Sequence, residues 1–224
     1  MSVLKEIKSR IASTCKKSGR EGSSVTLVAV SKFQPVEKIE ALLEQGHRVF
    51  GENRVQEAEE KYPVLRVKYP DIELHFIGHL QTNKAKDAVR LFDVIQTVDR
   101  PELAEALKRE MDKQKRPLPC FIQVNTGDEE QKGGVAPKDL AALYSFCKEL
   151  KLNITGLMCI PPADDIPDLH FALMHKLAGE LGLNHLSMGM SADFDIAIRY
   201  GATHVRIGSA LFGDRKPQAV HSAA

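Results

Sequence analysis

The chain has 224 residues, of which 43% are hydrophobic and 27% are charged, which is ordinary for a globular protein with a substantial core. Its 31 Lys and Arg residues against 30 Asp and Glu residues give a net charge of +1, so composition indicates no bulk attraction to nucleic acid or membrane. No apolar run approaches the roughly 20 residues that span a bilayer, and the N-terminal MSVLKEIKSR lacks the apolar centre of a signal peptide.

Apolar runs of strand length alternate with charged stretches of helical period along the chain. The N-terminal segment, about 1–18, predicts an amphipathic helix. The predicted strands that follow it are 25–32, 48–53, 74–80, 93–99, 120–126, 153–160, 185–191 and 204–210. The predicted helices between them are 35–45, 55–68, 83–91, 101–115, 137–150, 167–181 and 192–200. Four of these helices have a proline where the first helical position is expected, namely Pro35, Pro101, Pro137 and Pro167.

This alternation favours a parallel (β/α)8 TIM barrel over an open doubly wound sheet. No Pro/Ser-rich linker divides the chain, so we expect a single domain over 1–224 with a short C-terminal tail at about 216–224. The active mouth of such a barrel is built from the C-terminal ends of its strands. Several predicted strands end in polar residues, which are Lys32, Glu52, Asn53, His79, Asn125, Ser187, Ser191, Arg206 and Ser209.

The first predicted strand, VTLVAVSK, ends in Lys32. Because side chains alternate along a strand, Lys32 shares a face with Thr26, Val28 and Val30. At the mouth of a barrel, desolvation would lower the pKa of this amine and make it a nucleophile toward a carbonyl group. A surface lysine that merely closes a strand is the alternative, and this stretch alone does not exclude it.

The C-terminal stretch 186–215 contains two strand-to-helix turns rich in small residues, at Gly189–Ser191 and Gly208–Ser209. Barrels frequently bind phosphate with the loops after strands 7 and 8, where backbone N–H groups can approach an anion. Arg206 lies between Val205 and Ile207 in the last predicted strand and points to the opposite face from these two apolar residues. We therefore expect Arg206 to point into the barrel. Its partner there is either a carboxylate such as Glu52 or a ring nitrogen of a ligand.

The chain resembles the pyridoxal 5′-phosphate (PLP) homeostasis proteins, which are similar in fold to the barrel domain of bacterial alanine racemase. The matching stretches run from the first predicted strand to the last helical turn. They are VAVSK at 28–32, FGENRVQE at 50–57, HFIGHLQTNK at 75–84, GLMCIPP at 156–162, LSMGMSADF at 186–194 and VRIGSALFG at 205–213. No single stretch would suffice, but together they are highly specific.

The resemblance implies that Lys32 binds PLP through a Schiff base. It also implies that the phosphate is held by Ser191 and by the backbone at Gly208 and Ser209, and that Arg206 faces the pyridine nitrogen. The remaining residues implied to contact the cofactor are Asn53, His75 and Met188. The sequence also allows Asn53 to be the cap of the following helix.

The expected function is PLP homeostasis, as a carrier or buffer without robust catalysis. An arginine beside the pyridine nitrogen disfavours its protonation and so weakens the cofactor as an electron sink. The four tyrosines, Tyr62, Tyr69, Tyr144 and Tyr200, lie in predicted helices or at their ends, away from the mouth, so a second base for racemisation is not apparent. A PLP-dependent amino-acid racemase of low activity is the alternative.

A different class of function, a metal-dependent barrel hydrolase, would use His75, His79 and Glu73. Alternation in ELHFIGHL places the two histidines on one face but puts Glu73 at the start of the strand.

The expected partners are PLP itself and PLP-dependent apo-enzymes, and we expect a monomer with no nucleic-acid or membrane partner. The four cysteines, Cys15, Cys120, Cys147 and Cys159, form no CxxC pair and no metal-ligand spacing. They are typical of free thiols in a reducing compartment, so we expect a cytoplasmic protein.

Overall fold

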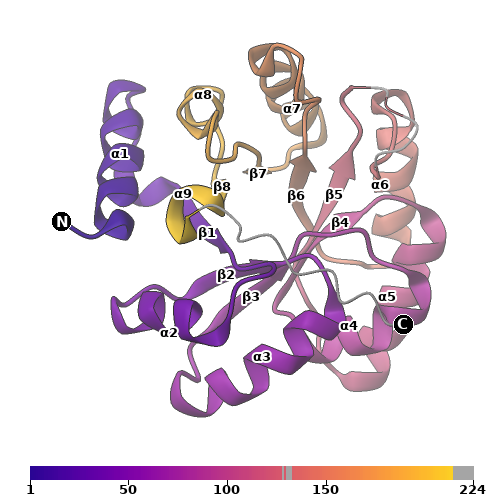
Figure 1. The fold of residues 1–224 in the computed structure, drawn as a ribbon. Helices are drawn as coiled ribbons and strands as arrows, with labels where there is room; N and C mark the ends of the chain where they lie inside the picture. Colours follow the sequence, from indigo (N-terminus) through magenta and orange to yellow (C-terminus); the bar gives the residue numbers. More distant parts are fainter. Residues whose placement is uncertain (128, 130–132, 214–224) are drawn as a thin grey trace, which may run out of the picture.

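A computed structural model describes residues 1–127, 129 and 133–213 of the chain. Eight parallel strands form a closed barrel in sequence order, which confirms the predicted (β/α)8 fold (Figure 1). The strands are β1 (Thr26–Val30), β2 (Val49–Glu52), β3 (Glu73–Phe76), β4 (Val94–Val98), β5 (Cys120–Val124), β6 (Ile154–Cys159), β7 (His185–Ser187) and β8 (His204–Ile207). The predicted C-terminal tail, 216–224, lies outside the described residues.

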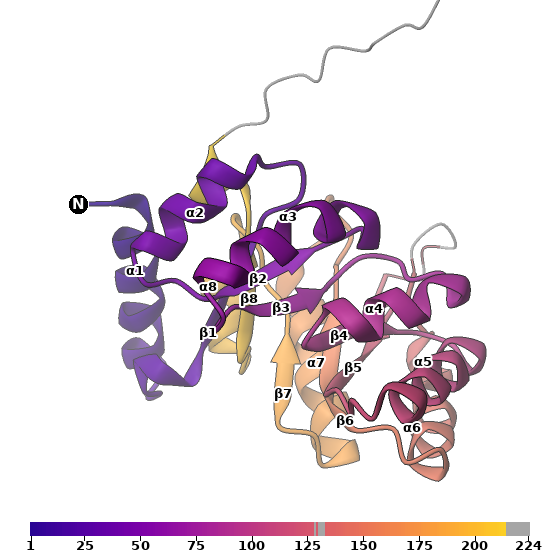
Figure 2. The ribbon, with the colours of Figure 1, turned by 90° about the horizontal axis from the view of Figure 1, so that it is seen from below.

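Helices surround the barrel, and α2, α3 and α4 lie along one side of it (Figure 2). The helices are α1 (Val3–Lys17), α2 (Val36–Glu44), α3 (Val55–Lys68), α4 (Ala85–Leu91), α5 (Pro101–Gln114), α6 (Leu140–Glu149), α7 (Pro167–Leu181), α8 (Phe194–Arg199) and α9 (Ser209–Phe212). The described residues also form short 3-10 segments, η1 (Gly22–Ser24), η2 (Thr82–Lys84) and η3 (Pro137–Asp139). In the part of the chain that the structure describes, no helix has the length and apolar character needed to cross a membrane.

The prolines begin helices largely as predicted, with two shifts. Pro101 and Pro167 are the first residues of α5 and α7. Pro35 instead caps α2 from outside, with an extended backbone, and Pro137 begins the 3-10 turn η3 that leads into α6. In each case the fixed φ of proline suits the start of a helix, where its missing N–H costs no hydrogen bond.

The apolar core has two parts, set by the alternation of side chains along each strand. The larger part lies between the strands and the helices and includes Leu27, Ala29 and Phe50. The smaller part is a cluster inside the barrel, formed by Val94, Phe121 and Met158. The rest of the buried interior is unusually polar for a barrel core, with buried His75, Gln96, Ser187 and Arg206 on the inward-facing strand positions.

Candidate functional site

A cavity of about 320 Å³ lies at the C-terminal mouth of the barrel. The residues that line it come from the ends of six strands and the loops that follow them. They are Val30, Lys32, Gln34, Asn53, Ile77, Ile160, Met190, Ser191, Ala192, Arg206, Gly208, Ser209 and Gly213. Six residues singled out from the sequence therefore meet in one place: Lys32, Asn53, Ser191, Arg206, Gly208 and Ser209.

The turn that carries Lys32 is stabilised by hydrogen bonds of the residues on either side of the lysine. β1 ends at Val30, and the next residue, Ser31, is buried and donates a hydrogen bond from its hydroxyl to Glu52 Oε1 at 2.7 Å. Phe33 has a φ of 61°, in the left-handed region that a bulky residue rarely adopts. Its backbone N–H donates to the Glu57 carboxylate, which fixes this conformation. The amine-bearing residue thus sits on a constrained turn rather than on a flexible loop.

Glu52 lies on the outer side of the barrel, beneath α3. Its strand neighbour Gly51 faces inward, because a Cβ built on Gly51 meets the side chains of Ile77 and Val28, so Glu52 must face outward. Glu52 is fully buried and accepts a hydrogen bond from Lys61 Nζ at 3.3 Å. Burial raises the pKa of Glu52 to about 7, opposed by the nearby charge of Lys61. The prediction that Glu52 might pair with Arg206 is wrong, because strand alternation puts the two on opposite faces of the sheet.

Arg206 forms part of the floor of the cavity, and only 4% of its surface is exposed. Its Nη1 donates to Ser187 Oγ at 2.8 Å and its Nη2 donates to the carbonyl oxygen of Cys159 at 2.7 Å. No carboxylate among the described residues forms an ion pair with it. Burial lowers the pKa of this guanidinium below its usual value. A buried cation held only by neutral acceptors leaves its remaining N–H groups available to a ligand.

Two hydroxyl groups meet at the wall of the cavity where the loops after β7 and β8 come together. Ser209 Oγ donates to Ser191 Oγ at 3.3 Å, and the backbone N–H of Ala210 lies 3.5 Å from Ser191 Oγ. Gly189, in the loop after β7, has a φ of +91°, and a Cβ there would lie 2.6 Å from the Cβ of Ala197. Only glycine allows this loop to pack so closely on α8 and bring Ser191 to the cavity. The wall offers short hydroxyl and backbone donors of the kind that bind an anion.

Asn53 follows β2 and lines the cavity. Its Oδ1 is buried and has no hydrogen-bond partner within the described residues. The structure does not support the alternative that Asn53 caps the following helix, since α3 has Arg54 at its cap position and no side-chain cap hydrogen bond. A buried polar atom without a partner at the edge of a cavity is a natural contact for a bound molecule.

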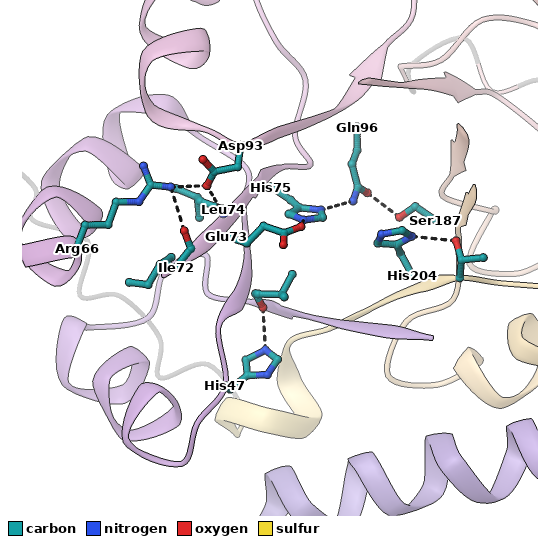
Figure 3. A network of polar contacts seen from close by, with 12 residues as sticks. His47, Arg66, Ile72, Glu73, Leu74, His75, Asp93, Gln96, Ser187 and His204 are labelled. Atoms are coloured by element: carbon teal, nitrogen blue, oxygen red, sulfur yellow. Dashed lines mark hydrogen bonds and ion pairs between the residues drawn. The ribbon is translucent and has the colours of Figure 1, made fainter. Parts of the chain in front are cut away.

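Two of the residues named from the sequence do not reach the cavity wall. Met188 is fully buried in the core between the barrel and its helices, because it shares the outward face of the strand with Leu186. Met190, two residues later, lines the cavity instead. His75 is fully buried inside the barrel and hydrogen-bonded to Glu73 and Gln96 (Figure 3). It does not line the cavity.

The three residues of the hydrolase alternative do not meet in one place. His75 and Glu73 are hydrogen-bonded to each other in the barrel, at 2.7 Å, but His79 is at the mouth with 63% of its side chain exposed. The described residues contain no group of three or more His, Cys, Asp or Glu side chains arranged to hold a metal ion. The tyrosines behave as predicted in that none lines the cavity, although Tyr62 is buried against the Ser31 hydroxyl, with 2.6 Å between the oxygens.

Sequence reasoning missed the buried Gln96 and the apolar lining of the cavity from Ile77, Ile160 and Met190. A glutamine in the middle of the apolar run DVIQTVD was an available signal, because a polar side chain on a buried strand requires hydrogen-bond partners. The apolar residues that line the cavity gave no such signal, because the sequence does not distinguish an isoleucine that faces a cavity from one that faces the core.

The fold and the mouth define a class, the barrels that present a lysine amine, an arginine and anion-binding hydroxyls together at the C-terminal ends of their strands. Residues 4–216 match the family model described as alanine racemase, N-terminal domain. The chain is 42% identical over 223 residues to the pyridoxal phosphate homeostasis protein of Aquifex aeolicus, and the match covers 95% of this chain and 97% of that one. The chain belongs to the alanine racemase N-terminal domain family and, within it, to the pyridoxal phosphate homeostasis proteins.

Solved structures agree with this assignment. The structure of PipY from Synechococcus elongatus without PLP has a TM-score of 0.83 and 39% identity, covering 92% of this chain and 100% of that one. The structure of PipY with PLP bound has a TM-score of 0.81 and 38% identity over the same shares of the two chains.

Proposed function

We propose that the chain binds PLP covalently through Lys32 at the barrel mouth and takes part in PLP homeostasis as a carrier or buffer. The observation that carries this proposal is the meeting of Lys32, Arg206, Ser191 and Ser209 around one cavity. Support comes from relatives that are named pyridoxal phosphate homeostasis proteins and from the PLP-bound structure of PipY.

The residues present suit this cofactor. The amine of Lys32 can condense with an aldehyde, releasing water, and so hold PLP covalently. The hydroxyls of Ser191 and Ser209, with the backbone at Gly208, would bind the phosphate. Arg206 would donate to the pyridine nitrogen, and the unpartnered Oδ1 of Asn53 would gain a contact. We do not assign ring contacts to His75 and Met188, because neither lines the cavity.

Arg206 also bears on why a carrier is favoured over an enzyme. A cation beside the pyridine nitrogen opposes its protonation, which weakens the ring as an electron sink for carbanion chemistry. The relatives that cover nearly the whole chain are named for homeostasis, whereas a racemase of low activity has only the general resemblance of the fold behind it.

The first test is spectroscopic and covalent. Added PLP should give the purified chain a visible absorption band, and borohydride should then fix the cofactor to the peptide that contains Lys32. The matched control is Lys32→Arg, which keeps the positive charge but should give neither the band nor the label. Pyridoxal, which lacks the phosphate, should bind more weakly than PLP. Label on another lysine, such as Lys84, would overturn the assignment of Lys32.

The second test separates a carrier from an enzyme. The PLP-loaded chain should not racemise L-alanine or other amino acids measurably, but should transfer PLP to a PLP-dependent apo-enzyme and restore that enzyme's activity. Free PLP at the same total concentration is the control for transfer. Steady racemisation that disappears in Lys32→Arg would favour the racemase alternative.

Further features belong to the same proposal. We propose PLP-dependent apo-enzymes as partners, a monomer as the working form, and one domain over 1–224, consistent with the family match over residues 4–216. We also propose a cytoplasmic location. The sequence supports this location through cysteines that form no CxxC pair, which is typical of a reducing compartment.

A further inference from the structure

A continuous hydrogen-bond chain runs through the polar interior of the barrel below the cavity. Starting at the cavity floor, Arg206 Nη1 donates to Ser187 Oγ at 2.8 Å, and Ser187 Oγ donates to Gln96 Oε1 at 2.6 Å. Gln96 Nε2 lies 2.7 Å from His75 Nδ1, and His75 Nε2 lies 2.7 Å from Glu73 Oε1. Figure 3 shows the part from Ser187 to Glu73. The chain joins strands β8, β7, β4 and β3 across the barrel.

The chemistry of the donors fixes the direction of this chain. The amide nitrogen of Gln96 can only donate, so Nδ1 of His75 must be the acceptor, and the ring proton of neutral His75 must lie on Nε2. His75 therefore donates to the Glu73 carboxylate. Every donor from Arg206 onward points away from the cavity, and the chain begins at a cation and ends at an anion.

The hydrogen-bond chain affects the stability of the Arg206 cation because the guanidinium is buried. Its guanidinium has no ion-pairing carboxylate among the described residues, and a buried charge without a counter-charge is costly. Asp193 is a carboxylate whose charge favours this cation without pairing with it. Hydrogen bonds arranged head to tail polarise one another, so the negative charge of Glu73 can add to this effect from the far end. Glu73 begins β3, with 49% of its side chain exposed, and the hydrogen bond from His75 lowers its pKa, which keeps it ionised.

We propose that Ser187, Gln96, His75 and Glu73 are positioning residues that hold the Arg206 guanidinium in the cavity floor, with Glu73 adding negative charge from the opposite end of the barrel. Arg206 is the proposed contact to the pyridine nitrogen, so this role in cofactor binding rests on the proposed function. The hydrogen-bond chain itself does not, and it can be tested in the protein without PLP.

The test uses two breaks in the chain and one matched control. Gln96→Leu removes the central amide, and Glu73→Gln removes the terminal charge at a half-exposed position while keeping the size of the side chain. Asp71→Asn is the control. Asp71 lies two residues before Glu73 in the sequence and pairs with Arg48, outside the hydrogen-bond chain, so the substitution removes the same charge without touching that chain. The readout is hydrogen exchange of the Arg206 guanidinium protons by 15N NMR without PLP, assigned by their loss in Arg206→Lys.

Exchange should be slow in the unmodified protein and faster by about tenfold or more in Gln96→Leu, since Ser187, which accepts from Arg206, loses the hydrogen bond that orders its hydroxyl. It should be faster by a smaller factor in Glu73→Gln and unchanged in Asp71→Asn. Unchanged exchange in both Gln96→Leu and Glu73→Gln would overturn the proposal, and so would an equal effect of Asp71→Asn and Glu73→Gln.

A second readout connects the chain to the cofactor. PLP affinity should fall by about tenfold in Gln96→Leu, as for the loss of an outer residue that orients a ligand-binding group, while Asp71→Asn keeps the original affinity. If the unmodified protein does not bind PLP, the proposed function fails, while the NMR result still decides whether the chain holds Arg206. If PLP binds and Gln96→Leu binds it equally well, the positioning role is wrong.

Discussion

Replacing Glu52 by Gln should remove a pH-dependent loss of stability. Relative to that of the unmodified protein, the free energy of unfolding of the variant should therefore rise as pH increases from about 4.5 to about 7. The carboxyl of Glu52 is fully buried, and burial raises its pKa to about 7. The folded chain therefore binds this proton more tightly than the unfolded chain, and the free energy of unfolding falls as the proton is lost. The fall due to Glu52 amounts to roughly 3 kcal/mol between those pH values.

The measurement is urea unfolding of both proteins from pH 4.5 to pH 8. Two histidines act in the opposite direction, because desolvation lowers the pKa of His47 to about 4 and that of His204 to about 3. The difference between variant and unmodified protein isolates Glu52 from these histidines. Glu60→Gln, on the exposed face of α3, is the control and should keep the original profile. A difference that does not change with pH would show that folding does not raise the pKa of Glu52 above its value in the unfolded chain.

This buried carboxyl has a place in the site even though it does not line the cavity. It accepts the hydrogen bond of Ser31, the residue before Lys32, and lies beside Lys61. The Lys61 amine also donates to the carbonyl oxygen of Ser31 at 3.1 Å. The structure therefore keeps a costly buried charge where it orders the end of β1. Stability lost at this position is consistent with a constraint on the turn that presents the amine.

Replacing Gly78 by Ala should destabilise the protein and impair the cavity together. Gly78 follows β3, and a Cβ built on it would lie 2.1 Å from the backbone oxygen of Asn53. Backbone atoms cannot yield as a flexible side chain can, so the loop that carries Asn53 must move. We expect a loss of about 1–3 kcal/mol in the free energy of unfolding, typical of overpacking. The displaced Asn53 should also weaken PLP binding.

The matched control is Gly179→Ala in α7, where a new Cβ meets nothing within 4 Å. Because alanine favours the helix, this change should stabilise the protein by about 0.5–1 kcal/mol and leave PLP binding unaltered. Thermal unfolding with and without PLP measures both effects. Normal stability and normal PLP affinity in Gly78→Ala would show that the loops after β2 and β3 are not packed as the structure has them.

The sequence by itself determined the barrel and most of the mouth. Strand and helix periods are local patterns, and alternation along a strand specifies which residues share a face. Once eight strand–helix repeats indicated a closed barrel, the position of Lys32 at a strand end and the parity of Arg206 pointed both residues to the barrel mouth, where both line the cavity. Their roles came from the resemblance. The turns before Ser191 and Ser209 could likewise be predicted from the sequence, because they are rich in glycine and other small residues.

Only the tertiary structure decided what meets across the barrel. Gln96, His75 and Ser187 come from three different strands, and their hydrogen bonds depend on the register and stagger of the closed sheet. The partner of Arg206 could not be chosen from sequence for the same reason. The resemblance placed Met188 near the cofactor, but Met188 packs in the outer core with Leu186. Met190 lines the cavity because the backbone leaves the strand path at Gly189, where φ is +91°. Periodicity carries information only while the strand continues, and a cavity forms where the strands end.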